Sequence, residues 1–459
     1  MSDSEFEENS FAIVVHPAVR GDERLRDPQA RLEEAVGLAA AIELDVVEAL
    51  IAPVVKPRAA TLLGSGKIEE INAKLAAHQP RPSLVIVDGA LTPVQHRNLE
   101  KEWNAKVLDR TALILEIFGA RAQTAEGRLQ VELAHLNYQR SRLVRSWTHL
   151  ERQRGGAGFL GGPGERQIES DRRALDDKII RLKQKLEEVR RTRTLQRAKR
   201  KRAPHPVVAL VGYTNAGKST LFNRLTKSSV MAEDLLFATL DPTMRAIDLP
   251  SGVRAIMSDT VGFISDLPTQ LVAAFRATLE EVLEADIVIH VRDIAHADSD
   301  AQRADVIKVL NELGLKGDDS RPVIEALNKI DLLSGDDRLD VEAIARLSQS
   351  GRSGTLAEPV RAAISAQTGE GVAALLDLVE EALTAEHDTQ TIRLASPFGA
   401  ARAWLHARTD ILEETSSGED LIIVARMAEK TEGQFFKLFP TATALSPSDL
   451  SEEVTEKRA

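Results

Sequence analysis

The sequence predicts a multidomain α/β protein, and three observations support this prediction. Apolar and polar segments alternate as short strands and helices through residues 11–120, which is the pattern of a parallel α/β domain. Apolar residues then recur at seven-residue steps, which indicates paired helices in residues 121–203. A second alternating region at 204–386 opens with an apolar strand, a glycine loop and a helix. We expect a small α+β domain at 387–445 and a disordered polar tail at 446–459.

The N-terminal α/β domain is expected to place a helix after each strand. The predicted strands are 11–15, 46–55, 84–88 and 105–108, and the predicted helices are 31–42, 67–77, 93–103 and 110–119. The segment Gly64-Ser65-Gly66-Lys67 is too short to predict a phosphate site, and we interpret it as a glycine turn before a helix.

Residues 121–203 are predicted to form an antiparallel helical hairpin, a coiled coil whose tip is the loop 155–164. The two heptad series are Leu129, Leu136, Leu143, Leu150 and Ile168, Leu175, Leu182, Val189. Six of the ten tip residues are glycine, so the backbone can approach another surface closely. Packing of the two helices on separate domains is the alternative arrangement.

The same region is strongly basic, although the whole chain has a net charge of −11. Residues 121–202 contain 22 Lys and Arg against 10 Asp and Glu, which favours binding to a polyanion such as RNA. Arg152 and Arg154 flank the tip and Phe159 lies within it, so phosphate contacts and base stacking are both expected. A solvated helical surface and a flexible linker are the simpler interpretations.

Residues 212–219 read Gly-Tyr-Thr-Asn-Ala-Gly-Lys-Ser, and they match the phosphate loop G-x-x-x-x-G-K-S/T. Gly212 and Gly217 let the backbone close around phosphate oxygens. We expect Lys218 to contact the β- and γ-phosphates as a catalytic residue and Ser219 to bind Mg²⁺. The predicted nucleotide contacts of this segment are Gly212, Tyr213, Thr214, Asn215, Ala216, Gly217, Lys218, Ser219 and Thr220.

Two further segments are expected beside the metal and the γ-phosphate. Asp259-Thr260-Val261-Gly262 follows an apolar strand, so Asp259 can hold Mg²⁺ through water and the Gly262 N–H can face the γ-phosphate. The second segment is the polar loop Phe237-Ala238-Thr239-Leu240-Asp241-Pro242-Thr243, whose predicted nucleotide contacts are residues 237–241. We assign Thr239 as a metal ligand and catalytic residue, with Thr243 as its competitor.

Base recognition is assigned to Asn328-Lys329-Ile330-Asp331, which follows a predicted strand at 322–327. The Asp331 carboxylate only accepts hydrogen bonds, so it suits the N1–H and 2-amino donors of guanine and disfavours adenine. Ser365-Ala366-Gln367 would present backbone N–H groups to the guanine O6. Five such segments in this order predict a GTPase that binds GTP and GDP.

Two positions bear on how GTP would be hydrolysed. Phe263 stands where many small GTPases place a glutamine that orients water, so we expect slow hydrolysis without a partner. Packing of the switch is the simpler role for Phe263. Asn215 is similar to the asparagine of potassium-activated GTPases, and this resemblance implies a K⁺ ion beside the phosphates.

Composition excludes several classes of function. The chain contains no cysteine, which excludes disulfides, thiolate metal sites and cysteine catalysis. No apolar stretch approaches the ~20 residues of a membrane span, and the acidic N-terminus has no signal-peptide pattern. We therefore expect a cytoplasmic protein. As a separate expectation, the protein is a monomer that binds the partners given below.

Residues 124–133, the tip loop with its continuation into 163–169, and the order of the GTPase segments together resemble the HflX family. This resemblance implies a GTPase that binds the large (50S) ribosomal subunit through its RNA and splits or rescues stalled or idle ribosomes under stress. It also implies a weak ATP-directed activity in the N-terminal domain, for which the sequence shows no site. Leu160 and Arg166 depart from the family's frequent arginine and threonine, so tip contacts are not carried over there.

Two other functions stay open at this point. One is an RNA-remodelling ATPase led by the N-terminal domain. The other is a GTP-dependent signalling switch that acts on protein partners without RNA.

Overall fold

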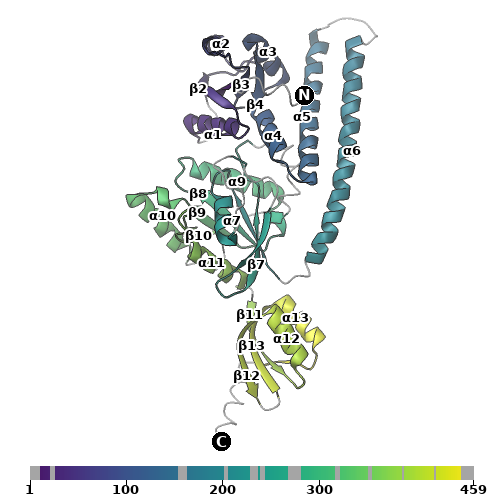
Figure 1. The fold of residues 1–459 in the computed structure, drawn as a ribbon, viewed down its shortest axis with the longest axis vertical. Coiled ribbons are helices and arrows are strands. Elements are labelled where there is room, and N and C mark those ends of the chain that lie inside the picture. The colour runs from purple at the N-terminus through teal and green to yellow at the C-terminus, as the bar shows by residue number, and fades with distance from the viewer. Residues whose placement is uncertain are drawn as a thin grey trace.

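The structure is a computed structural model with three sheets and two long, paired helices (Figure 1). It describes residues 11–20, 26–153, 163–200, 205–227, 236–237, 243–266, 281–315, 321–349, 354–384, 387–417 and 420–445. The predicted fold class is confirmed: a parallel N-terminal sheet, a helical hairpin, a phosphate-loop domain and an antiparallel C-terminal sheet follow one another. The predicted domain limits stay predictions.

The first sheet is parallel throughout and has the strand order β2-β1-β3-β4. Its strands are β1 (Phe11–Val19), β2 (Asp45–Val54), β3 (Leu84–Val87) and β4 (Lys106–Asp109). Its helices are α1 (Pro28–Ala40), α2 (Ser65–Ala77), α3 (Pro93–Trp103) and α4 (Arg110–Arg121). Successive strand residues face opposite sides, so Val14 packs in the core under α1 and α4, and Val15 in the core under α2 and α3.

Local side chains explain where these helices begin. Asp27 accepts a hydrogen bond from Ala30 N, and Asp109 accepts one from Ala112 N. Thr92 and Gln95 form a reciprocal capping box before α3. Gly64 precedes α2, as the glycine turn predicted.

Helices α5 (Ala125–Gln153) and α6 (Pro163–Arg200) run side by side along one edge of the molecule (Figure 1). Leu136, Ile179 and Leu182 are buried between them, with partly buried heptad residues around. The tip residues Phe159 and Leu160, and the side chains of Arg152 and Arg166, lie outside the described part of the chain.

The second sheet has the order β10-β9-β8-β5-β7-β6, and only β6 pairs antiparallel. Its strands are β5 (Val207–Gly212), β6 (Thr243–Asp248), β7 (Arg254–Asp259), β8 (Ile287–Asp293), β9 (Val323–Asn328) and β10 (Val360–Ala363). Its described helices are α7 (Lys218–Thr226), α9 (Ser299–Leu313), the short η2 (Ile330–Leu332), α10 (Gly335–Ser348) and α11 (Val372–Thr384). The carboxyl ends of its parallel strands meet at one edge, where ligands bind in open α/β sheets.

The third sheet is antiparallel and lies at the end of the molecule opposite the N-terminal sheet (Figure 1). It contains β11 (His387–Leu394), β12 (Asp410–Ser417), β13 (Asp420–Ala428) and β14 (Thr443–Leu445), with α12 (Gly399–Arg408) and α13 (Glu429–Leu438). Phe435 and Leu405 are buried in its own core. The predicted tail at 446–459 lies outside the described residues. None of the helices in the described part of the chain has both the length and the apolarity needed to cross a bilayer.

Candidate nucleotide site

The phosphate loop joins β5 to α7, and its shape requires glycine at position 217. Gly217 has φ +93°, and a Cβ there would lie 2.2 Å from the amide nitrogen of Asn328. Asn328 ends β9, more than a hundred residues further along the chain. The loop and the predicted base-recognition segment therefore meet directly.

Lys218, the first residue of α7, has a buried side chain. Its amine donates a hydrogen bond of 2.7 Å to the carbonyl oxygen of Tyr213 in the same loop. Burial lowers the pKa of this amine to about 8, and the nearby Asp259 carboxylate opposes the shift. A phosphate that replaced the carbonyl as partner would favour the charged amine.

Ser219 and Asp259 lie together beside the loop. The Ser219 hydroxyl donates to Oδ2 of Asp259 at 2.8 Å, and Asp259 is fully buried at the end of β7. A hydroxyl beside a carboxylate is the hard-oxygen donor set that Mg²⁺ prefers. Among the described residues no cluster of three or more His, Cys, Asp or Glu side chains could hold a metal ion. By the chemistry of its oxygen donors, the Ser219–Asp259 pair fits Mg²⁺.

The segment Thr260–Gly262 lies against the phosphate loop. The Phe263 N–H donates to Gly212 O at 3.0 Å, and the Thr214 N–H donates to Phe263 O at 2.7 Å. A Cβ on Gly262 would come within 3.0 Å of the Lys218 amine. Thr260 donates from its hydroxyl to Leu210 O at 2.6 Å, which fixes the segment from behind.

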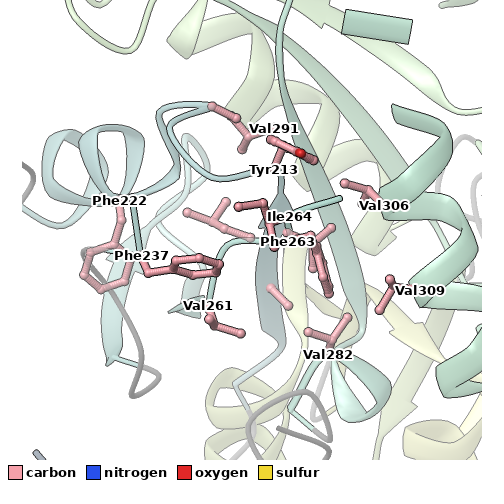
Figure 2. Close-up of a cluster of buried hydrophobic side chains, with 14 of the residues drawn as sticks. Tyr213, Phe222, Phe237, Val261, Phe263, Ile264, Val282, Val291, Val306 and Val309 are labelled. Carbon is pink, nitrogen blue, oxygen red and sulfur yellow. The ribbon is translucent and has the colours of Figure 1, made fainter. Parts of the chain in front are cut away.

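Phe263 points into the protein. Its ring is 1% exposed and lies in the buried cluster with Val282, Val306 and Val309 (Figure 2). In this structure the side chain therefore packs in the core beside the site.

Asn328 connects two predicted segments. Its amide nitrogen donates to Ala216 O at 2.8 Å, and its amide oxygen accepts from Ala366 N at 2.8 Å. Lys329 has φ +68° and pairs with Asp293 at 2.8 Å, while Ile330 is buried.

Asp331 lies in η2 and is exposed. The neighbouring loop Ser365-Ala366-Gln367 is also held by a residue outside the segment Asn328–Asp331. Arg224 of α7 donates to Ala366 O at 2.7 Å and also to Gln367 O. Ser365 is fully buried, and its hydroxyl accepts from Thr368 N.

Four of the five predicted segments thus converge at the carboxyl ends of the central strands. Of the remaining segment the structure describes Phe237, whose ring lies 4.6 Å from that of Phe118 in the N-terminal domain. Ala238, Thr239, Leu240 and Asp241 lie outside the described residues. Thr243 begins β6 opposite Asp259, so it belongs to a strand and not to the polar loop in which it was placed.

The sequence did not reveal three residues that shape the site. Arg224 holds the loop 365–367, Phe118 packs against Phe237, and Glu34 of the N-terminal domain accepts a hydrogen bond from the Tyr213 hydroxyl at 2.7 Å. No sequence pattern marks these contacts, because each joins residues far apart in the chain.

Comparison with known families gives three consecutive matches. The model described as "GTP-binding GTPase N-terminal" matches residues 29–119, "GTP-binding GTPase Middle Region" matches 121–200, and "50S ribosome-binding GTPase" matches 207–329. These three matches follow the order of the first sheet, the paired helices and the phosphate-loop domain.

Curated relatives agree over most of the chain. GTPase HflX of Magnetococcus marinus is 48% identical over 407 residues, covering 88% of this chain and 90% of the relative. GTPase HflX of Escherichia coli is 41% identical over 392 residues, covering 85% and 87%. Among solved structures, the complex of SsGBP with GDP is 26% identical with a TM-score of 0.47, covering 81% of this chain and 97% of that one. The chain therefore belongs to the HflX family, and it is an enzyme that binds and hydrolyses GTP.

Proposed function

We propose that this GTPase associates with the large ribosomal subunit and that GTP hydrolysis controls its release. The observation that carries the proposal is the long basic arm formed by α5 and α6, which stands along the edge of a GTPase (Figure 1). A domain match described as a 50S ribosome-binding GTPase supports the same partner.

Exposed cations on the arm are available to RNA phosphates. The side chains of Arg173 and Arg191 are 77% and 78% exposed, and each faces a glutamate one helical turn away. Such exposed pairs contribute about 0.3–0.5 kcal/mol, so a phosphate can replace the glutamate at little cost. Contacts of this kind fix position on RNA without reading sequence.

Within the nucleotide site, we assign the phosphate contacts to the loop 212–220 and to Gly262. Lys218 would exchange its bond to Tyr213 O for the β- and γ-phosphates. Ser219 and Thr239 would hold Mg²⁺, with Asp259 supporting the metal through water. The metal would neutralise negative charge on the β-phosphate of the departing GDP and on the γ-phosphate that is transferred.

Guanine selection is assigned to Asn328 and Asp331, with backbone N–H groups of Ser365, Ala366 and Gln367 on the guanine O6. Asn328 already binds both the phosphate loop and Ala366, so its main role would be to hold these segments together. Asp331 would supply the direct contact to the base.

Two catalytic features belong to the same proposal. Phe263 is buried, so a partner would have to orient the attacking water and stimulate hydrolysis. Asn215 is exposed in the phosphate loop, where it would help to bind K⁺. Equal turnover rates in sodium and potassium buffers would exclude the role of K⁺.

Sedimentation with purified 50S and 70S ribosomes tests the proposed partner. We expect more co-sedimentation with a non-hydrolysable GTP analogue than with GDP, and loss of binding when residues 155–164 are replaced by a short serine linker. The matched control removes the C-terminal residues 446–459 and should bind normally. Ribosome binding that depends neither on the bound nucleotide nor on residues 155–164 would contradict the proposal.

Subunit splitting or rescue under stress is the finer part of this proposal, and the cytoplasm is its expected location. Appearance of free 50S and 30S subunits in gradients would support splitting. ATP turnover that survives Lys218→Ala would favour the RNA-remodelling ATPase instead. Full activity toward a protein partner without ribosome binding would favour the signalling switch.

A further inference from the structure

Tyr213, the second residue of the phosphate loop, points out of the loop and into the contact with the N-terminal domain. It is 4% exposed. Its hydroxyl donates to Glu34 Oε2 at 2.7 Å and accepts from the Ser265 N–H at 2.8 Å. Arg26 also donates to this hydroxyl, at 3.2 Å, and its guanidinium lies 5.5 Å from the ring centre. One donor and two acceptor interactions saturate the hydroxyl.

Ser265 is enclosed by the same network. Arg110, which is 3% exposed, donates to the Ser265 hydroxyl at 2.8 Å and to the Ser265 carbonyl at 3.2 Å. The Ser265 hydroxyl donates to Glu34 Oε1 at 3.2 Å, and Arg31 pairs with the following Asp266 at 3.1 Å. The N–H, the carbonyl and the hydroxyl of Ser265 are therefore all bound.

The charges of this network are arranged so that Glu34 stays ionised. Burial alone would raise the pKa of Glu34, but the charge of Arg110 and hydrogen bonds from Arg110 and Tyr213 hold it below its ordinary value. Burial and the same carboxylate raise the pKa of Tyr213, so the phenol keeps its proton. An anionic acceptor beside a neutral phenol makes the Tyr213–Glu34 hydrogen bond a charge-assisted one.

The contact occupies the place in the N-terminal domain where a parallel sheet would bind a ligand. Asp88 follows β3, at the edge where the strand order reverses between β1 and β3. That carboxylate pairs with Arg110 and with His16, and Arg110 continues to Ser265. Ser265 of the GTPase domain thus contacts this edge of the N-terminal sheet through Arg110.

Ser265 lies three residues after Gly262, so fixing Ser265 restricts where the Gly262 backbone can lie. Phe263 is paired with the phosphate loop by two backbone hydrogen bonds, and Ser265 is held by Tyr213 and the N-terminal domain. Both anchors keep Gly262 against Thr214 and Lys218. A γ-phosphate would be met there, whereas the contacts assigned to GDP do not involve this segment.

We infer that Tyr213 is a positioning residue for GTP hydrolysis: its hydroxyl, held by Glu34 of the N-terminal domain, fixes Ser265 and so keeps the Gly262 N–H in place for the γ-phosphate. The N-terminal domain thereby forms part of the GTPase site. This inference rests on the nucleotide site assigned above and is independent of ribosome binding.

Tyr213→Phe tests the inference because it keeps the ring and removes only the hydroxyl. The purified full chain is measured for its affinity for GDP, its affinity for a non-hydrolysable GTP analogue, and its single-turnover GTP hydrolysis without ribosomes. Leaving the Ser265 N–H unpaired and removing one hydrogen bond from Glu34 should weaken analogue binding and slow hydrolysis by about tenfold. GDP affinity should change less than about twofold, because GDP lacks the phosphate that Gly262 meets.

The chain's other tyrosine is the matched control. The Tyr138 hydroxyl donates to Asp109 at 2.8 Å, between α5 and the N-terminal domain, so Tyr138→Phe should leave both nucleotide affinities unchanged. Glu34→Gln tests the same link without touching the phosphate loop and should reproduce the selective loss, even if Tyr213→Phe does not fold. The double variant should lose little more than either single variant.

Three results would overturn the inference. An equal loss of GDP and analogue affinity would show a general structural role for Tyr213. Unchanged analogue binding and hydrolysis in Glu34→Gln would separate the N-terminal domain from the site. Faster hydrolysis in Tyr213→Phe would mean that the hydroxyl restrains the segment and does not position it. Absence of any nucleotide binding in the wild-type chain would instead contradict the assigned site itself.

Discussion

At the scale of single residues, the burial of Lys218 predicts how stability and nucleotide binding depend on pH. Lys218 is satisfied by Tyr213 O, and its pKa is lowered to about 8 because burial disfavours the ammonium. Unfolding restores the ordinary value of 10.5, so the unfolded chain binds more protons between these values. The free energy of unfolding of the nucleotide-free protein should therefore rise across this window.

Nucleotide binding should show the opposite dependence. A phosphate favours charged Lys218, so above about pH 8 binding requires proton uptake and GDP affinity should fall by up to tenfold per pH unit. Calorimetry in two buffers of different ionisation enthalpy would measure the uptake. An affinity that stays constant from about pH 7 to 9.5 would contradict the role given to Lys218.

Base selection is a second residue-scale prediction. Asp331→Asn replaces an acceptor with a side chain that can donate, so preference should move from guanine toward xanthine nucleotides by about a hundredfold or more. Competition binding of GDP and XDP measures the change. Asp336→Asn, on an exposed residue in the first turn of α10, is the control. Unchanged guanine preference in Asp331→Asn would disprove the assignment.

At the scale of elements, β8 and β9 carry a buried ionic cluster, from which we predict that the GTPase domain loses stability in acid. Glu325 is fully buried and accepts from Arg303 at 2.7 Å and from Arg361 at 2.8 Å. Burial would raise its pKa, but His290 and these arginines hold it low. Burial lowers the pKa of His290 from 6.5 to about 4.

His290 and Glu325 both make the free energy of unfolding decrease as the pH falls. The unfolded state binds more protons than the native state below about pH 6.5, so stability should fall as the pH drops toward 4. His290 alone contributes on the order of 3 kcal/mol across this window. Urea unfolding at about pH 6.5 and 4.5 should show a smaller change in His290→Gln than in the control His205→Gln, whose side chain is exposed. Equal pH dependence in the two variants would contradict this account.

Helix starts at 93 and 110 were predicted where α3 and α4 begin, and the structure shows the caps that set them. Thr92 with Gln95 and Asp109 with Ala112 are contacts over three residues, so local sequence encodes them. Strand β6 was not predicted. Its exposed residues show no apolar alternation of their own, and the segment is a strand because it pairs with β7.

In the whole molecule, the N-terminal domain connects the arm to the GTPase domain. Asp109, at the end of β4, accepts from Tyr138 at 2.8 Å and from Arg142 at 2.6 Å on α5. Arg110, the next residue, binds Ser265 beside the nucleotide site. Two adjacent residues thus contact both the arm and the GTPase domain.

Loosening the arm should therefore weaken ribosome binding without changing the nucleotide site. Arg142→Ala removes one of the two anchors on Asp109, and we expect co-sedimentation with 50S subunits to fall several-fold at unchanged GDP affinity. Arg402→Ala removes an equal charge from the C-terminal domain, where Arg402 pairs with Glu414, and should have little effect. A parallel loss of GDP affinity in Arg142→Ala would show that the arm contact supports the site as well.

The sequence by itself determined the class of fold, the heptad-paired arm and the four nucleotide segments that the structure brings together. These features depend on periodicity and on short motifs, in which neighbouring residues carry the signal. Only the tertiary structure decided that Tyr213, Glu34, Arg110 and Ser265 form one buried network. These residues lie far apart in the sequence and follow no periodic pattern. Burying charged side chains between two domains is favourable only when their hydrogen-bonding and ionic partners are buried with them.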